Sequence, residues 1–169
     1  MRKFLLSLAF TLAYMAGAQT ATVTPSAVQN LYGAGGSYSF NASPAVAGTA
    51  MYAHQIIAPT ENYNGATYAF TVVDALPNNT KPFTVNTNIG VGIAQKVAQF
   101  KGASFYMPTS AGISFNGSNT GWQWNGGLVA AIPVKDGYYI MPTVRFLKSS
   151  VGNGTGYQPI LGVLFGWGK

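Results

Sequence analysis

The residues that most often carry out chemistry in proteins are scarce in this chain and lie far apart. It has one histidine, His54, three acidic residues, Glu61, Asp74 and Asp136, and no cysteine. A catalytic hydroxyl needs an adjacent base, yet no serine accompanies the histidine in its local stretch, residues 52–55 (YAHQ). We therefore expect that the protein is not an enzyme, and we interpret His54 as a residue of the interior or of an interface.

Metal and cofactor sites are not expected either. The three acidic residues are well separated in the sequence, and we place each of them at or near a turn. The absence of cysteine removes thiolate ligands and disulfides. Two glycine-rich stretches, residues 32–36 (YGAGG) and 153–156 (NGTG), lack the following helix whose N-terminus would bind a phosphate.

The composition excludes a nucleic-acid partner and indicates β-structure in contact with lipid. Net charge is +6, partly from Arg2 and Lys3, but the seven later basic residues are scattered rather than clustered. Only 7% of the residues are charged, against roughly 25% in soluble domains. Apolar residues make up 48%, yet no run after residue 18 reaches the length of a membrane helix, which is about 20 residues.

The elements that would position these side chains follow a two-residue period, which is typical of β-strands. In each segment one parity is apolar and the other is small or polar, and we expect the apolar parity to face lipid. In residues 63–74, for example, Tyr68, Phe70 and Val72 are expected to face outward and Gly65 inward. The pattern is least clear in residues 46–57. The eight segments are residues 30–40, 46–57, 63–74, 83–94, 103–115, 121–132, 138–147 and 157–167.

The last segment carries a recognisable pattern. Gly162 is followed by Phe165 and Trp167, three and five positions on, close to the end of the chain. This resembles the closing strand of bacterial outer-membrane β-barrels, in the small eight-stranded OmpA/OmpX-like class, where such residues act as the assembly signal. The Gly168-Lys169 tail departs from the pattern, because the family usually ends at the aromatic residue.

The resemblance implies an all-β fold, a closed antiparallel up-and-down transmembrane barrel of about eight strands. It also implies location in the bacterial outer membrane, contact with outer-membrane lipid and with the barrel-assembly machinery, and a monomeric state. An even strand number places both termini in the periplasm and the loops near Ser43, Asn79, Ser118 and Gly152 outside.

The N-terminus has the features of a secretory leader. A basic start and a short apolar core end in residues 16–18 (AGA), which predicts cleavage between Ala18 and Gln19. An uncleaved anchor is the alternative. We therefore divide the chain into a signal peptide, residues 1–18, a polar lead-in, residues 19–29, and the barrel, residues 30–169.

One basic residue, Arg145, lies on the face of its strand whose other residues are mostly small or polar. Arg145 is expected to point into the barrel, as a lumen plug bonded to Asn, Gln or Tyr, because an arginine facing lipid at mid-depth costs about 2–4 kcal/mol. A ligand site is the alternative reading. The other inward residues are mostly small, which predicts a hydrated but interrupted interior.

Other folds and functions stay open at this point. Pro108, Pro142 and Pro159 fall inside expected strands and mark bulges or displaced boundaries. A soluble secreted β-sandwich or lipocalin-like barrel is the competing fold. The expected function is a non-enzymatic role in envelope structure or surface contact. The alternatives are a porin-like transporter of small or apolar solutes and a lipid-modifying enzyme that uses His54.

Overall fold

The computed structural model describes residues 29–40, 45–58, 65–78, 84–117, 119–151 and 157–168. The predicted signal peptide, its cleavage site at Ala18 and Gln19, and nearly all of the lead-in lie outside the described residues. Among the described residues there is no helix long and apolar enough to cross a membrane.

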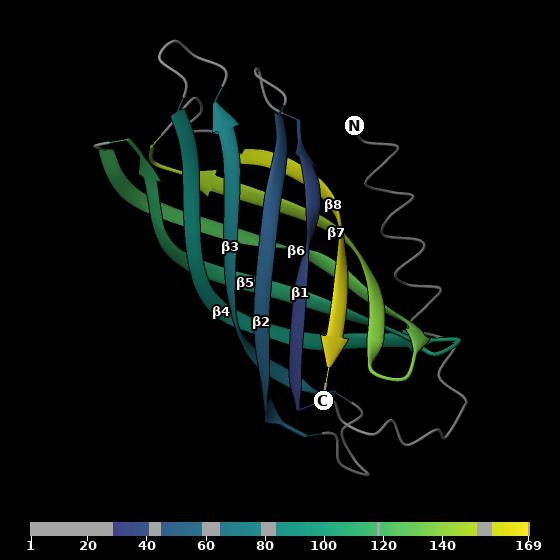
Figure 1. The fold of residues 1–169 in the computed structure, drawn as a ribbon. Coiled ribbons are helices and arrows are strands. Elements are labelled where there is room, and N and C mark those ends of the chain that lie inside the picture. Colours follow the sequence, from purple (N-terminus) through teal and green to yellow (C-terminus); the bar gives the residue numbers. More distant parts are fainter. Residues whose placement is uncertain are drawn as a thin grey trace, which may run out of the picture.

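Eight antiparallel strands form one closed barrel, in which each strand pairs with its sequence neighbours and β8 returns to β1 (Figure 1). The predicted all-β, up-and-down architecture is therefore confirmed. The strands are β1 (Asn30–Ser39), β2 (Ala45–Ile57), β3 (Thr67–Asn78), β4 (Thr84–Phe100), β5 (Ala103–Asn116), β6 (Asn119–Lys135), β7 (Tyr138–Ser149) and β8 (Tyr157–Gly168).

Two tight turns define one end of the barrel. Residues 101–102 join β4 to β5 and residues 136–137 join β6 to β7. Lys101 and Gly102 have φ angles of 47° and 83°, as a type I′ hairpin turn requires. Gly137 has a φ of 76° and follows the register shift near the end of β6. We call this end, where β1 also starts and β8 finishes, the turn end. We call the opposite end the loop end.

The two-residue period correctly predicted which side chains face outward in most strands. In β4, Val91 and Ile93 are exposed on the outside, whereas Asn88 and Gly90 are buried inside. The same holds in β8, where Phe165 and Trp167 are exposed and Ile160 is fully buried.

The prediction for β3 was wrong, because this strand turns its bulky face inward. Tyr68, Phe70 and Val72 are buried and pack together inside the barrel. Asp74 shares their parity and is 1% exposed. The reversal has a physical reason: the opposite face of β3 carries no charge, whereas the carboxylate of Asp74 finds an ion-pair partner, Arg145, inside the barrel. The bulky face also fills space that the small inward residues of neighbouring strands leave.

Several boundaries differ from the expected ones. β3 extends through Pro77, which was assigned to a loop, and β4 extends to Phe100. Pro108 and Pro142 lie inside strands, and each sits where pairing with β6 is interrupted. Proline lacks the N–H that would donate a hydrogen bond to the neighbouring strand, which explains why the pairing is interrupted at both positions.

Candidate functional site

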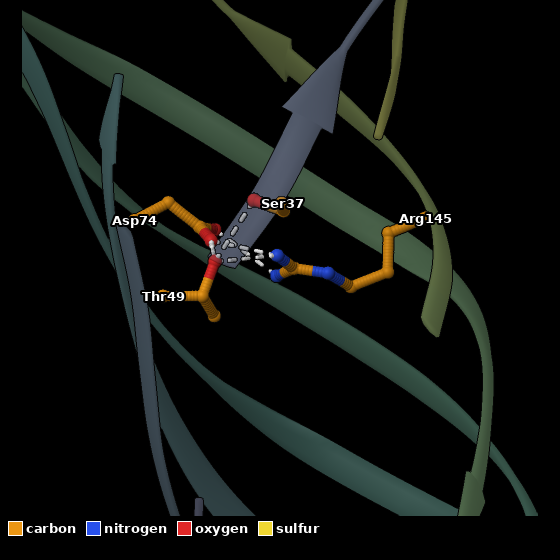
Figure 2. Close-up of polar contacts among 4 residues, drawn as sticks. All are labelled: Ser37, Thr49, Asp74 and Arg145. Atoms are coloured by element: carbon orange, nitrogen blue, oxygen red, sulfur yellow. Dashed lines mark hydrogen bonds and ion pairs between the residues drawn. The ribbon is translucent and has the colours of Figure 1, made fainter. Parts of the chain in front are cut away.

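The interior is crossed by an ion pair between opposite walls of the barrel. Arg145 on β7 donates through Nη1 to Asp74 Oδ2 at 3.0 Å and through Nη2 to Asp74 Oδ1 at 2.7 Å (Figure 2). β3 and β7 are four strands apart in a ring of eight, so this pair spans the full bore. Such two-point contacts between a guanidinium and a carboxylate fix the relative position of both groups.

Two hydroxyl groups complete this cluster. Thr49 Oγ1 donates to Asp74 Oδ1 at 2.6 Å and accepts from Arg145 Nη2 at 3.2 Å, and Ser37 Oγ lies 3.2 Å from Thr49 Oγ1 (Figure 2). We call these four residues the plug cluster. It joins β1, β2, β3 and β7, and all four side chains are buried.

The sequence placed Arg145 inside the barrel but gave it the wrong partners. Its partners are a carboxylate and a hydroxyl rather than Asn, Gln or Tyr, and Asp74 lies within β3 rather than at a turn. The available signal was parity: Asp74 is an acidic residue within a period-2 segment, on the same face as Tyr68 and Phe70.

An apolar layer covers the plug cluster on its loop-end side. It consists of Ala47, Leu76, Leu147 and Ile160, which form one buried cluster. Ala47, Leu76 and Leu147 each lie two residues from a plug-cluster residue on β2, β3 or β7, and Ile160 lies on the adjoining β8. Leu147 and Ile160 are at most 1% exposed. Side chains therefore lie across the interior at two successive levels.

On its turn-end side the interior is apolar and contains a cavity of about 30 Å³. Its walls include Met51, Tyr68, Phe70, Val129 and Met141. That volume exceeds the roughly 10–15 Å³ needed to hold one water molecule, but the side chains around it are apolar. The bulky inward face of β3, which the sequence assigned to lipid, builds much of this wall.

Toward the loop end, the inner faces of β4, β5, β6 and β7 carry a group of polar side chains. Ser149 Oγ donates to Ser114 Oγ at 2.7 Å, and Ser114 Oγ donates to Asn88 Oδ1. Both amide atoms of Gln123 and the Oδ1 of Asn125 are buried without a protein hydrogen-bond partner. Buried polar atoms of this kind need water, so the predicted hydrated but interrupted interior fits this arrangement.

The outer surface carries aromatic side chains near both ends. At the loop end Lys148 Nζ lies 5.8 Å from the ring centroid of Trp122 and 5.1 Å from that of Tyr157. At the turn end Tyr32 stacks on Trp167 with centroids 5.7 Å apart. We call these two groups the aromatic girdles: Tyr38, Phe40, Trp122, Trp124 and Tyr157 at the loop end, and Tyr32, Tyr52, Phe100, Tyr138 and Trp167 at the turn end.

The charged residues avoid the surface between the girdles. Within the described ranges, three charged side chains are buried: Asp74, Lys96 and Arg145. The other four lie in turns or within two residues of a strand end: Lys101, Lys135, Asp136 and Lys148. No described charged side chain therefore lies on the outer surface midway between the two ends.

His54 lies on the outer face near the turn end. Its Nδ1 is 2.9 Å from Asn30 Oδ1, to which the Tyr52 hydroxyl also donates at 3.0 Å. Tyr52 in turn packs beside Tyr32. The structure therefore places His54 on the outer surface, beside Tyr52 of the turn-end girdle, and not in the interior. In the part of the chain that the structure describes, no serine bonds to this imidazole.

The residues of the closing-strand pattern take two different positions. A Cβ on Gly162 would lie 2.8 Å from Ser37 Cβ, so this glycine allows close packing against the interior face of β1. Phe165 and Trp167 point outward and are 64% and 48% exposed. Their parity places the aromatic rings where lipid contact is expected and leaves the glycine inside.

Within the described ranges, no three histidine, aspartate or glutamate residues gather in a way that could hold a metal ion. No known family model matches this chain, and no curated protein matches it either.

Proposed function

We propose that the protein is a monomeric integral protein of the bacterial outer membrane, exported by a cleavable signal peptide, with its turn end in the periplasm. Its role is non-enzymatic and lies in envelope structure or surface contact. The observation that carries this proposal is the distribution of charge: described charged residues lie inside the barrel or near its ends, and the outer surface between the girdles is uncharged.

Energetics favour lipid over water around this barrel. Val91 and Phe165, for example, are 63% and 64% exposed on the outer face. Soluble proteins rarely expose large contiguous apolar patches, and a water-facing surface is normally rich in charge. A soluble barrel would carry most of its charges on the outside, whereas here Arg145 and Asp74 lie inside and large apolar side chains such as Val91 lie outside. Aromatic rings at two levels match the interfaces of a bilayer.

A closed lumen favours the structural role over transport. The plug cluster and the apolar layer of Leu76 and Leu147 lie across the bore at successive levels. We expect purified protein in a planar bilayer to give no steady single-channel steps. Steps that occur only in an Arg145→Ala variant would assign the block to that side chain. Steady steps from the native protein would contradict the closed barrel and support a transporter.

Two valines with equal exposure provide the test of membrane insertion. Val91, near the middle of β4, and Val134, one residue from the turn end of β6, are both 63% exposed. In lipid, Val91→Arg should lower the free energy of unfolding by about 2–4 kcal/mol and Val134→Arg by about 0–1 kcal/mol. The measurement is denaturant unfolding in liposomes. In a water-soluble barrel the two substitutions would have the same small effect, and that outcome would reject the proposal.

Assembly depends, in this proposal, on the closing strand. Gly162, Phe165 and Trp167 form the signal that the barrel-assembly machinery reads. Their support is the resemblance of the pattern together with its geometry, since both rings project outward from the strand that completes the barrel.

A further inference from the structure

A half-buried lysine on the outer surface of the loop end lies among aromatic rings. Lys148 is the last outward residue of β7, and its backbone pairs with Trp124 on β6 and with Tyr157 on β8. Its Nζ lies within the range of a cation–π contact, about 6 Å, of two ring centroids, those of Trp122 and Tyr157. We call these four residues the lysine–aromatic cluster.

Hydrogen bonds and ring contacts hold this cluster in place across three neighbouring strands. Trp122 N donates to Ser150 Oγ at 2.9 Å, and Ser150 N donates to the Trp122 carbonyl oxygen at 2.9 Å. These two bonds keep β6 and β7 joined beyond Lys148. The rings of Trp124 and Tyr157 pack edge to face, with centroids 6.2 Å apart. The position of the ammonium group is therefore defined by its surroundings.

The charge of Lys148 has no anionic partner in the described part of the chain. Of the acidic residues described there, Asp74 is buried and bound to Arg145, and Asp136 lies in a turn at the opposite end of the barrel. Aromatic rings attract a cation but do not neutralise it. The cluster also contains other hydrogen-bond donors, namely the two indole N–H groups and the Tyr157 hydroxyl. Such a set suits a negatively charged group with several oxygen atoms.

We propose that the lysine–aromatic cluster binds the phosphate of an anionic lipid. The inference rests on the proposed membrane insertion, which places the loop-end girdle at the level of the lipid headgroups. Lys148 Nζ donates to the phosphate oxygens, for which lysine is a common partner. The rings of Trp122 and Tyr157, which are 52% and 64% exposed, pack beside the glycerol region. The proposal gives the envelope role a partner of defined chemistry at one place on the barrel.

Tryptophan fluorescence provides the test, because two of the three tryptophans belong to the cluster. The Trp167→Phe variant keeps Trp122 and Trp124 and is folded into liposomes of phosphatidylcholine and phosphatidylglycerol. In each preparation one of the two lipids carries bromine on its acyl chains close to the glycerol, and bromine quenches indole fluorescence at short range. Comparing the two preparations gives the affinity for the anionic lipid relative to the zwitterionic one. We expect a preference of about fivefold for phosphatidylglycerol.

Two charge variants, made in the same Trp167→Phe background, identify the contact. Lys148→Gln should remove the preference, so that both lipids quench according to their share of the bilayer. Lys101→Gln removes the same charge at the opposite girdle, where the lysine lies 5.3 Å from the ring centroid of Phe100, and should leave the preference unchanged. Inorganic phosphate in the buffer should not abolish the preference, because the rings hold the lipid as well as its phosphate.

Four outcomes would overturn the proposal: equal affinity for the two lipids, an unchanged preference in Lys148→Gln, an equal loss in Lys101→Gln, or loss of the preference when inorganic phosphate is added. The last would indicate a site for a free anion rather than a lipid. Quenching of Trp167 by brominated phosphatidylcholine, in a variant with phenylalanine at positions 122 and 124, reports membrane insertion independently. Failure of the lipid site is therefore distinguishable from failure of the proposed function.

Discussion

A chain that ends at Leu164 is expected to lose the folded barrel altogether. The five deleted residues, 165–169, include the β8 partners of Leu31, Tyr32, Gly33 and Ala34. Their loss leaves the first half of β1 as an open edge. In a bilayer each unpaired backbone group costs several kcal/mol because no water is present to replace its partner. That sum exceeds the 5–15 kcal/mol by which whole domains are typically stable.

Two control variants separate backbone closure from the aromatic rings. Deleting Lys169 alone leaves every described β1–β8 pair in place and should leave the barrel folded. The double substitution Phe165→Ala and Trp167→Ala keeps the ladder and should fold in liposomes, while its assembly in cells declines. The measurement is protease-resistant barrel on a gel without heating. Native amounts of folded barrel from the chain that ends at Leu164 would show that closure by β8 is not required.

Replacing Asp74 by leucine is expected to cost about 3–5 kcal/mol of unfolding free energy. The substitution removes the carboxylate that accepts both guanidinium hydrogen bonds of Arg145. The arginine is 4% exposed, so its charge stays buried with only Thr49 as a partner. Breaking one side of a buried ion pair carries this penalty, whereas the net stabilisation from an intact pair is small.

The matched control removes both charges together. In Asp74→Leu combined with Arg145→Met no uncompensated charge remains, and stability should return to within about 1–2 kcal/mol of the native protein. Denaturant unfolding of all three proteins in the same liposomes gives the comparison. If the Asp74→Leu protein were as stable as the double variant, the buried charge of Arg145 would not depend on Asp74 for compensation.

Much of the barrel could be predicted because its outer and inner surfaces carry different kinds of side chain at alternate residues. The clear alternation in β4, such as Val91 outside and Gly90 inside, shows directly which residues face outward. Bulk was misleading in β3, because its larger side chains share a face with Asp74 and point inward with it. There the carboxylate of Asp74 decided the orientation, so a single charged residue outweighed the bulk of Tyr68 and Phe70.

The candidate sites could be predicted only in part. Periodicity shows that Arg145 faces inward, but it does not show which residue lies across the bore. The partner, Asp74, is 71 positions away in sequence, and the meeting depends on strand tilt and register, which no local pattern encodes. The apolar cavity was missed for the same reason as β3, because Tyr68 and Phe70, two of its lining residues, were assigned to lipid.

The most direct test is to measure where the outer face of β4 lies in a bilayer. The chain has no cysteine, so single cysteines can carry spin labels at alternate outward positions of β4: Val85, Ile89, Val91, Ile93 and Val97. In liposomes, collision of the label with oxygen should be greatest near Val91 and fall toward both ends, while collision with a water-soluble nickel complex should show the opposite profile. Uniformly high collision with the nickel complex at all five positions would mean that this surface faces water, and the membrane-spanning barrel would be wrong.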